Sequence, residues 1–189
     1  MYSTFAFGVE KKEAGFTKFN IQRNEPGDHD VQFDVKFCGI CHTDVHYADP
    51  NSQVTKYPLV PGHELAGVVT KVGRKVVDVK VGDEVGVGCI SDSCQECSYC
   101  QEGEEQACEK GGHSMTYNAD TVHGHIKTGT GWTQGGYCGS MTVHRQYIVK
   151  VPQGYPLAMT GPILCAGIHF NHNIKTIASV QYQPQSIHF

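Results

Sequence analysis

The sequence predicts a mainly β fold made of short strands and many turns. Glycine accounts for 22 of the 189 residues, well above the usual ~7%, and glycine favours turns over long helices. Residues 31–37 alternate apolar and polar side chains with period two, which is typical of a half-buried strand. A run rich in Val, Ala and Gly at 65–72 predicts a second strand.

Further elements follow in chain order. The turn at Gly82-Asp83 leads into a predicted strand at 83–90. Residues 91–112 are polar and contain four clustered cysteines, so we expect a loop that is stable only when a cross-link holds it together. Gly135-Gly136-Tyr137 opens another β region, with strands at 141–143 and 147–151, and Pro152 ends it. A short helix is expected from about Leu157. The tail after Ile168 has neither a helical stripe nor a clean alternation.

Composition excludes several classes of protein. The formal net charge of −4 disfavours a nucleic-acid or anionic-membrane surface, because both require a basic face. No run approaches the ~18 apolar residues of a membrane span, and the first residues lack a signal-peptide pattern. We therefore expect a cytoplasmic protein with no membrane or nucleic-acid partner. Nine cysteines at C-x2-C spacings then indicate metal ligation rather than disulfides.

The four-cysteine loop has the pattern Cys94-x2-Cys97-x2-Cys100-x7-Cys108. Two-residue gaps allow neighbouring thiolates to bind one ion, and four sulfur ligands leave no coordination position open. The pattern therefore predicts a closed, structural zinc site. An iron–sulfur cluster and buried free cysteines are the alternatives. A ferredoxin run has a three-residue gap and a following Pro, whereas here the gap is seven residues and Glu109 follows.

A second group of candidate ligands is dispersed along the chain. Cys41 is expected at the end of the first strand, Pro61-Gly62-His63-Glu64 supplies an imidazole and a carboxylate, and Cys165 lies in the segment Pro162-Ile163-Leu164-Cys165-Ala166-Gly167. Two thiolates and one imidazole would form a zinc site with an open fourth position. Taken singly, these residues are as consistent with a buried apolar Cys and a solvated loop His.

Several motifs together resemble the zinc-containing medium-chain alcohol dehydrogenases. Gly62-His63-Glu64-x2-Gly67-x5-Gly73-x2-Val76 is similar to that family's zinc signature. Further matching segments occur in the family's order: Cys38-Gly39-Ile40-Cys41-His42-Thr43-Asp44-Val45-His46, Tyr57-Pro58-Leu59-Val60-Pro61, the cysteine loop, Gly135-Gly136-Tyr137 and Leu164-Cys165-Ala166-Gly167. Within the family, the chain is most similar to the cinnamyl alcohol dehydrogenase branch of NADP-dependent aldehyde reductases.

The resemblance implies a role for individual residues. Cys41, His63 and Cys165 would hold a catalytic zinc, and the loop cysteines a structural zinc, giving two Zn²⁺ per chain. Thr43 would contact the oxygen of a small alcohol or aldehyde and pass a proton toward His46. Asp44 would orient a zinc-bound imidazole, Glu64 would lie behind the ligands or bind transiently, and His42 would face the cofactor phosphates. The implied fold is a GroES-like, partly open β-barrel with a zinc-binding loop lobe.

The resemblance runs from about residue 5 to Ile168. It implies a GroES-like catalytic domain at 1–168, including the structural zinc lobe at 91–112, followed by a divergent tail at 169–189. The family's Rossmann domain needs G-x-G-x-x-G between a strand and a helix, and a βαβ unit takes 30 or more residues. Only 24 residues with one glycine follow Cys165, so we expect that domain to be absent from a truncated chain.

Three functional hypotheses follow. The first is a zinc-dependent alcohol dehydrogenase that interconverts alcohols and aldehydes by hydride transfer with NADP or NAD. The second is a non-catalytic zinc-binding fragment, acting as a monomer or paired with a full-length relative. The third is a purely structural or regulatory zinc domain, which the residues of the open site disfavour. Family descent favours the alcohol dehydrogenase. For this chain acting alone we favour the non-catalytic fragment, since the domain that would bind and position the hydride donor is missing.

Overall fold

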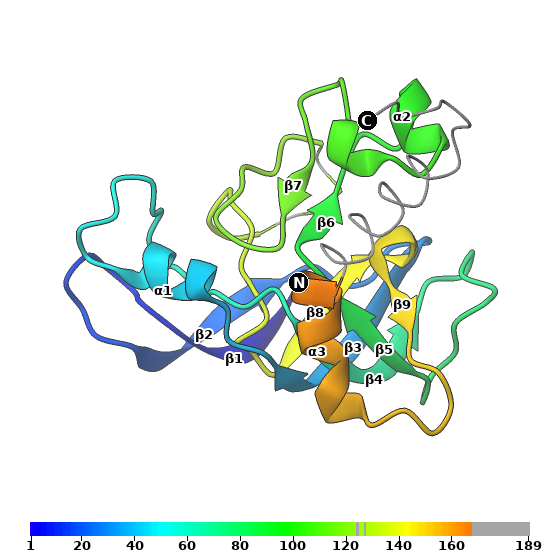
Figure 1. Ribbon diagram of the computed structural model, residues 1–189, viewed down its shortest axis with the longest axis horizontal. Coiled ribbons are helices and arrows are strands. Elements are labelled where there is room, and N and C mark those ends of the chain that lie inside the picture. The colour runs from blue at the N-terminus through cyan, green and yellow to red at the C-terminus, as the bar shows by residue number, and fades with distance from the viewer. Residues whose placement is uncertain (124, 127, 168–189) are drawn as a thin grey trace, which may run out of the picture.

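The computed structural model describes residues 1–123, 125–126 and 128–167 (Figure 1). The predicted tail at 169–189 therefore lies outside the described residues. The strands are β1 (Tyr2–Gly8), β2 (Thr17–Arg23), β3 (Asp30–Cys38), β4 (Leu65–Val72), β5 (Glu84–Val87), β6 (Ile90–Asp92), β7 (Ser114–Met115), β8 (Ser140–His144) and β9 (Val149–Lys150). The helices are α1 (His42–Ala48), α2 (Ser98–Gln101) and α3 (Thr160–Pro162), with 3₁₀ turns at Glu105–Ala107, Arg145–Tyr147 and Leu157–Met159 and a π turn at Ile163–Gly167.

An antiparallel five-stranded sheet in the order β8-β3-β4-β5-β9 carries the main core. Its inward side chains are mostly branched aliphatics, which suit a pleated, half-buried surface. Val31, Phe33, Leu65 and Val85 are fully buried among them. Two smaller sheets complete the fold: β1 pairs with β2, and β6 pairs with β7. The predicted mainly β architecture is confirmed.

The predicted strands agree with the structure to different degrees. The strand predicted at 65–72 matches β4, and the one at 31–37 lies within β3. The predicted strand at 83–90 is instead two strands, β5 and β6, separated at Gly88-Cys89. The predicted strand at 147–151 is shorter than expected, because a 3₁₀ turn occupies Arg145–Tyr147 and only β9 follows. The hairpin of β1 and β2 and the helix α1 were not predicted.

A glycine in β5 allows the last helical segment to approach the sheet. A Cβ atom at Gly86 would lie 2.4 Å from Leu164 Cδ1 and 3.0 Å from Thr160 Cγ2, closer than side chains tolerate. Only glycine accommodates this approach. Figure 1 shows α3 in front of the sheet. The contact brings Cys165, the residue after Leu164, back toward the strand ends.

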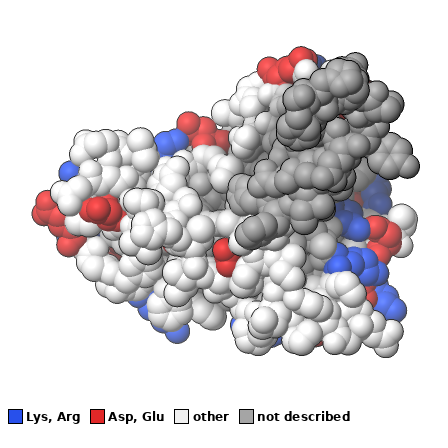
Figure 2. Space-filling view, viewed as in Figure 1, with Lys and Arg blue, Asp and Glu red and all other residues white. Residues whose placement is uncertain are grey.

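A lobe made of residues 91–112 extends from the sheet. Figure 1 shows β6, β7 and α2 together above the five-stranded sheet. The surface in Figure 2 has acidic and basic side chains interspersed along its edges, with acidic groups at the top of the view. Among the residues that the structure describes, no helix is long and apolar enough to cross a membrane.

Candidate metal centres

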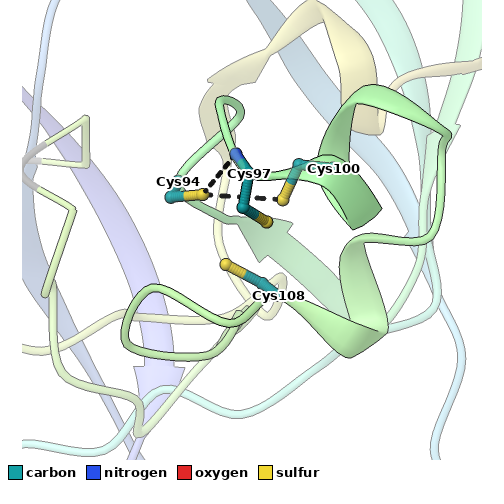
Figure 3. Close-up of side chains that lie close together, drawn as sticks. All are labelled: Cys94, Cys97, Cys100 and Cys108. Atoms are coloured by element: carbon teal, nitrogen blue, oxygen red, sulfur yellow. Dashed lines mark hydrogen bonds between the residues drawn. The ribbon is translucent and has the colours of Figure 1, made fainter.

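The four loop cysteines converge on one point, as Figure 3 shows. Their sulfur atoms all lie within 4.8 Å of one another, and Cys94 Sγ is 3.8 Å from Cys100 Sγ. Cys97, Cys100 and Cys108 are buried, and Cys94 is half-buried. All nine cysteines are free thiols. The structure therefore brings together the complete set that the spacing predicted.

Backbone amides in this lobe point at the cysteine sulfurs and stabilise their negatively charged form. The amide N–H of Cys97 lies 3.3 Å from Cys94 Sγ. Hydrogen bonds from the backbone amides of Cys100 and Glu109 lower the pKa of the Cys97 thiol to about 6. Amides directed at sulfur stabilise thiolates, and thiolates are the form that binds metals.

The second predicted group also converges, although its members lie up to 124 positions apart. Ligand atoms of Cys41, His63, Glu64 and Cys165 all lie within 4.8 Å of one another. Cys165 Sγ is 3.3 Å from His63 Nε2. His63, Glu64 and Cys165 are buried, whereas Cys41 is partly exposed. The cluster thus has one solvent-facing side.

Cys41 occupies a different element from the one predicted. The strand β3 ends at Cys38, and Cys41 is the N-cap of α1. The prediction that Cys41 ends the first strand is therefore wrong. Asp44, the third residue of the helix, accepts a 2.9 Å hydrogen bond from the Cys41 amide, as an acidic residue at this position does in a capping box. The backbone amide of Thr43 lowers the pKa of the Cys41 thiol.

Asp44 joins the loops that carry Cys41 and His63. Its Oδ1 accepts a 2.9 Å hydrogen bond from the Gly62 amide and lies 3.3 Å from His63 Nδ1. Burial opposes ionisation, but hydrogen bonds from His63 and the two amides outweigh it and lower the pKa of Asp44. Burial similarly disfavours charge on His63, but the carboxylate raises the pKa of that imidazole. A proton on Nδ1 leaves Nε2 directed at Cys165.

Gly62 gives the His63 loop its shape. Its φ is +102°, and a Cβ atom there would lie 2.8 Å from both Cys38 Sγ and Tyr137 Cδ1. Glycine is the residue that adopts this conformation without strain. The loop is held from the other side by Gly136, whose amide donates to the Gly62 carbonyl at 2.8 Å.

The remaining predicted residues lie on α1 at the exposed side of the cluster. Thr43 Oγ1 is 3.6 Å from Cys41 Sγ. His42 and His46 are exposed and pack edge to face, with ring centroids 4.4 Å apart. Thr43 therefore borders the cluster, whereas the two imidazoles form a separate pair one helical turn apart.

Two neighbours of this cluster were not among the predicted site residues. Cys89, between β5 and β6, shares a side-chain hydrogen bond with Cys165, and burial raises the pKa of both thiols. Tyr117 packs on His63 with ring centroids 5.9 Å apart. Neither residue belongs to a spacing motif, so only the fold reveals them.

The comparisons with known proteins agree with this geometry. Residues 27–153 match the family described as "Alcohol dehydrogenase GroES-like domain". The NADP-dependent alcohol dehydrogenase C 1 of Mycolicibacterium smegmatis is 46% identical over 168 residues, which make up 89% of this chain and 46% of that protein. The probable cinnamyl alcohol dehydrogenase 6 of rice is 47% identical over 79% of this chain and 39% of its own length.

Solved structures of related enzymes match most of this chain and about half of their own length. A cinnamyl alcohol dehydrogenase from Sorghum bicolor has a TM-score of 0.84 at 36% identity, over 94% of this chain and 48% of its own. The Helicobacter pylori enzyme, solved in complex with NADP(H), has a TM-score of 0.81 at 34% identity, over 92% and 48%. The chain spans about half the length of the relatives that it matches.

Proposed function

Because the chain belongs to the zinc-containing medium-chain alcohol dehydrogenase family, in its cinnamyl alcohol dehydrogenase-like branch, we propose that it is the zinc-binding catalytic domain of an alcohol dehydrogenase. The reaction is the interconversion of an alcohol and an aldehyde with NADP. We assign Cys41, His63 and Cys165 to a catalytic zinc ion, and the four lobe cysteines to a structural one. The observation that carries the proposal is the convergence of Cys41, His63 and Cys165 at the partly exposed cluster.

The lobe fits a single zinc ion. Four Zn–S bonds of ~2.3 Å in tetrahedral geometry require sulfur–sulfur edges of about 3.8 Å, which is the distance from Cys94 Sγ to Cys100 Sγ. A disulfide would need ~2.05 Å instead. Since all four sulfurs lie within reach of one ion, the geometry favours zinc over an iron–sulfur cluster, which distributes its thiolates over several irons.

The open cluster also fits zinc by its chemistry. Two thiols and an imidazole form the donor set of a three-ligand catalytic zinc site. Burial holds the Cys165 thiol neutral, with its pKa raised, when no cation is present. A divalent cation reverses that preference and deprotonates the thiol. The buried side chain of Glu64 offers a further oxygen within 4.8 Å of the other ligand atoms.

Each group at the open cluster has a separate role in the proposed reaction. When bound, zinc supplies Lewis acidity toward the oxygen of an alcohol or aldehyde, and NADP supplies or accepts the hydride. We assign to the Thr43 hydroxyl, whose Oγ1 lies 3.6 Å from Cys41 Sγ, the hydrogen bond to that oxygen and the transfer of its proton. His46 receives the proton toward solvent. His42, at the first residue of α1, faces the side on which we place the cofactor phosphates.

A second candidate function is supported by the coverage of the relatives. These residues correspond to about half of each relative's length, and we place most cofactor contacts in the other half. Alone, the 189 residues are then a non-catalytic zinc-binding fragment, either monomeric or paired with a full-length relative. On this view the domain comprises residues 1–168, and 169–189 are a tail of divergent sequence.

A nicotinamide absorbance assay separates the two candidates. The purified, zinc-loaded chain is mixed with NADPH and an aromatic aldehyde, with Cys41→Ser as the control. Turnover above the control supports the dehydrogenase. A folded chain that binds two zinc ions without turnover supports the fragment. A chain that binds no zinc contradicts both.

A further inference from the structure

Two tyrosines bracket β8, and each hydroxyl enters a hydrogen-bond chain that ends at a different cysteine cluster. Tyr137 precedes the strand and Tyr147 follows it. Tyr137 reaches the open cluster through Asp44, and Tyr147 reaches the lobe through Ser93. One short strand thus connects the supports of both candidate metal sites.

Tyr137 acts on the carboxylate that orients His63. Its hydroxyl donates a 3.0 Å hydrogen bond to Asp44 Oδ2, with the Gly39 carbonyl oxygen 3.3 Å away. The opposite oxygen, Oδ1, lies 3.3 Å from His63 Nδ1. Holding Oδ2 therefore fixes the rotation of the carboxylate and, through it, the direction of the imidazole.

The backbone of Tyr137 is itself locked onto the His63 loop. Its amide donates to the Pro61 carbonyl at 3.0 Å, and the Gly135 amide donates to the Val60 carbonyl at 2.6 Å. A Cβ atom at Gly136 would lie 2.3 Å from Leu65 Cγ. These backbone contacts fix the position from which the Tyr137 side chain extends toward Asp44.

Tyr147 acts on the lobe in a parallel way. Its hydroxyl donates a 2.7 Å hydrogen bond to Ser93 Oγ, which lies 3.2 Å from Cys100 Sγ. Ser93 is fully buried. The Cys100 thiol donates to the same Ser93 oxygen, so Ser93 Oγ links the Tyr147 hydroxyl to the Cys100 sulfur.

We propose that Tyr137 and Tyr147 are positioning residues, each of which sets the stability of metal binding at one cluster: Tyr137 at the open cluster and Tyr147 at the lobe. The inference rests on the proposed zinc occupancy of both clusters. It gives Tyr137 of the Gly135-Gly136-Tyr137 motif a role in supporting the open cluster. It also connects the lobe to Tyr147, which lies outside residues 91–112.

The test compares Tyr137→Phe with Tyr147→Phe in the full chain. The rate of zinc release to a chromogenic chelator is measured for each site, and Cys41→Ser identifies the phase that belongs to the open cluster. The Co²⁺-substituted chain supplies a spectroscopic signature for each site. Tyr2→Phe is the matched control, because its part-buried hydroxyl lies 3.2 Å from Thr142 Oγ1 on the same strand but contacts neither cluster.

We expect Tyr137→Phe to speed release from the open cluster several-fold, up to about tenfold, and to shift its Co²⁺ bands while leaving the lobe unchanged. Tyr147→Phe should do the reverse. Loss of an outer-shell partner costs ~10–100-fold in affinity, and these tyrosines lie one bond further out. Variants that affect neither site, or both equally, overturn the inference. A wild-type chain that binds fewer than two zinc ions overturns the proposed function first.

Double-mutant cycles keep the proposal testable when a single variant folds poorly. Asp44→Asn should mask the effect of Tyr137→Phe, and Ser93→Ala should mask that of Tyr147→Phe, because each pair acts along one chain. Additive effects within a pair would show that the tyrosines act only through general packing, which contradicts the proposal.

Discussion

The guanidinium of Arg23 donates a 2.6 Å hydrogen bond to the carbonyl oxygen of Gln134, 111 residues further along the chain. The same side chain donates to the Gly135 carbonyl at 2.7 Å and is almost fully buried. Arginine presents several donors in a fixed fork, which a lysine cannot reproduce. The end of the β1–β2 hairpin therefore holds the segment that carries Tyr137.

Replacing Arg23 by Lys should destabilise the chain. The change leaves at least one buried carbonyl oxygen without a donor, which costs about 1–3 kcal/mol. Urea denaturation followed by tryptophan fluorescence measures the loss. Arg74→Lys is the control, since Arg74 pairs with Asp28 at an exposed site and should change the free energy of unfolding by less than ~1 kcal/mol. Equal effects would contradict the assigned role of Arg23.

Gly62→Ala should disrupt the open cluster. The new methyl group combines a left-handed φ with contacts of 2.8 Å to Cys38 Sγ and Tyr137 Cδ1. Gly82→Ala isolates the first effect, because Gly82 has a φ of +91° and nothing within 4 Å of its Cβ position. We expect ~1–2 kcal/mol for Gly82→Ala and more for Gly62→Ala, together with loss of one zinc ion in metal analysis. Unchanged zinc content in Gly62→Ala would count against this loop as part of the site.

Asp44→Asn should weaken zinc binding at the open cluster by about 10–100-fold. The two carboxylate oxygens of Asp44 accept hydrogen bonds from the Cys41 and Gly62 amides. An asparagine would replace one of these oxygens by an N–H₂ group, which would face a donor instead of accepting from it. Competition with a chelator measures the affinity. Asp49→Asn, at the other end of α1 and exposed, is the matched control and should leave it unchanged. An unaltered affinity in Asp44→Asn would refute the orienting role.

Removing zinc from the lobe should expose it to proteolysis. Residues 91–112 contain two strand residues and two short helical turns, and their buried cluster consists of cysteines. A closed metal site of this kind supplies folding free energy itself. Trypsin should then cleave after Lys110 in the chelated chain but not in the zinc-loaded chain. Identical cleavage patterns would show that the lobe folds without metal.

The pH dependence of stability should contain a contribution from Asp83. The Lys80 amide and the Lys150 ammonium lower the pKa of this carboxyl, with distances of 3.1 Å for each contact. A depressed folded-state pKa contributes stability above the unfolded pKa, near 4, and that stability is lost as pH falls through the folded value. Asp83→Asn should therefore lower the melting temperature at pH 7, and the difference from wild type should shrink at the acid end. A constant difference would contradict the assignment.

The sequence predicted which side chains come together better than it predicted the elements that carry them. Spacing identified the lobe, since Cys94 to Cys108 are local, but the open cluster required a family resemblance because only the fold joins Cys41 to Cys165. The hairpin was missed because β1 reverses the usual pattern: Ala6 is buried while Phe5 and Phe7 face outward. The helix α1 was missed because its seven residues are held by the Asp44 cap rather than by helix propensity.

The two clusters also differ in when they can form. All four lobe ligands lie within one short stretch of chain, so little loop-closure entropy opposes their meeting, and the lobe can close as soon as Cys108 has been synthesised. The open cluster cannot close before Cys165 has been synthesised and the preceding residue, Leu164, has packed against Gly86. If both clusters bind metal as proposed, the lobe is therefore complete earlier in synthesis than the open cluster.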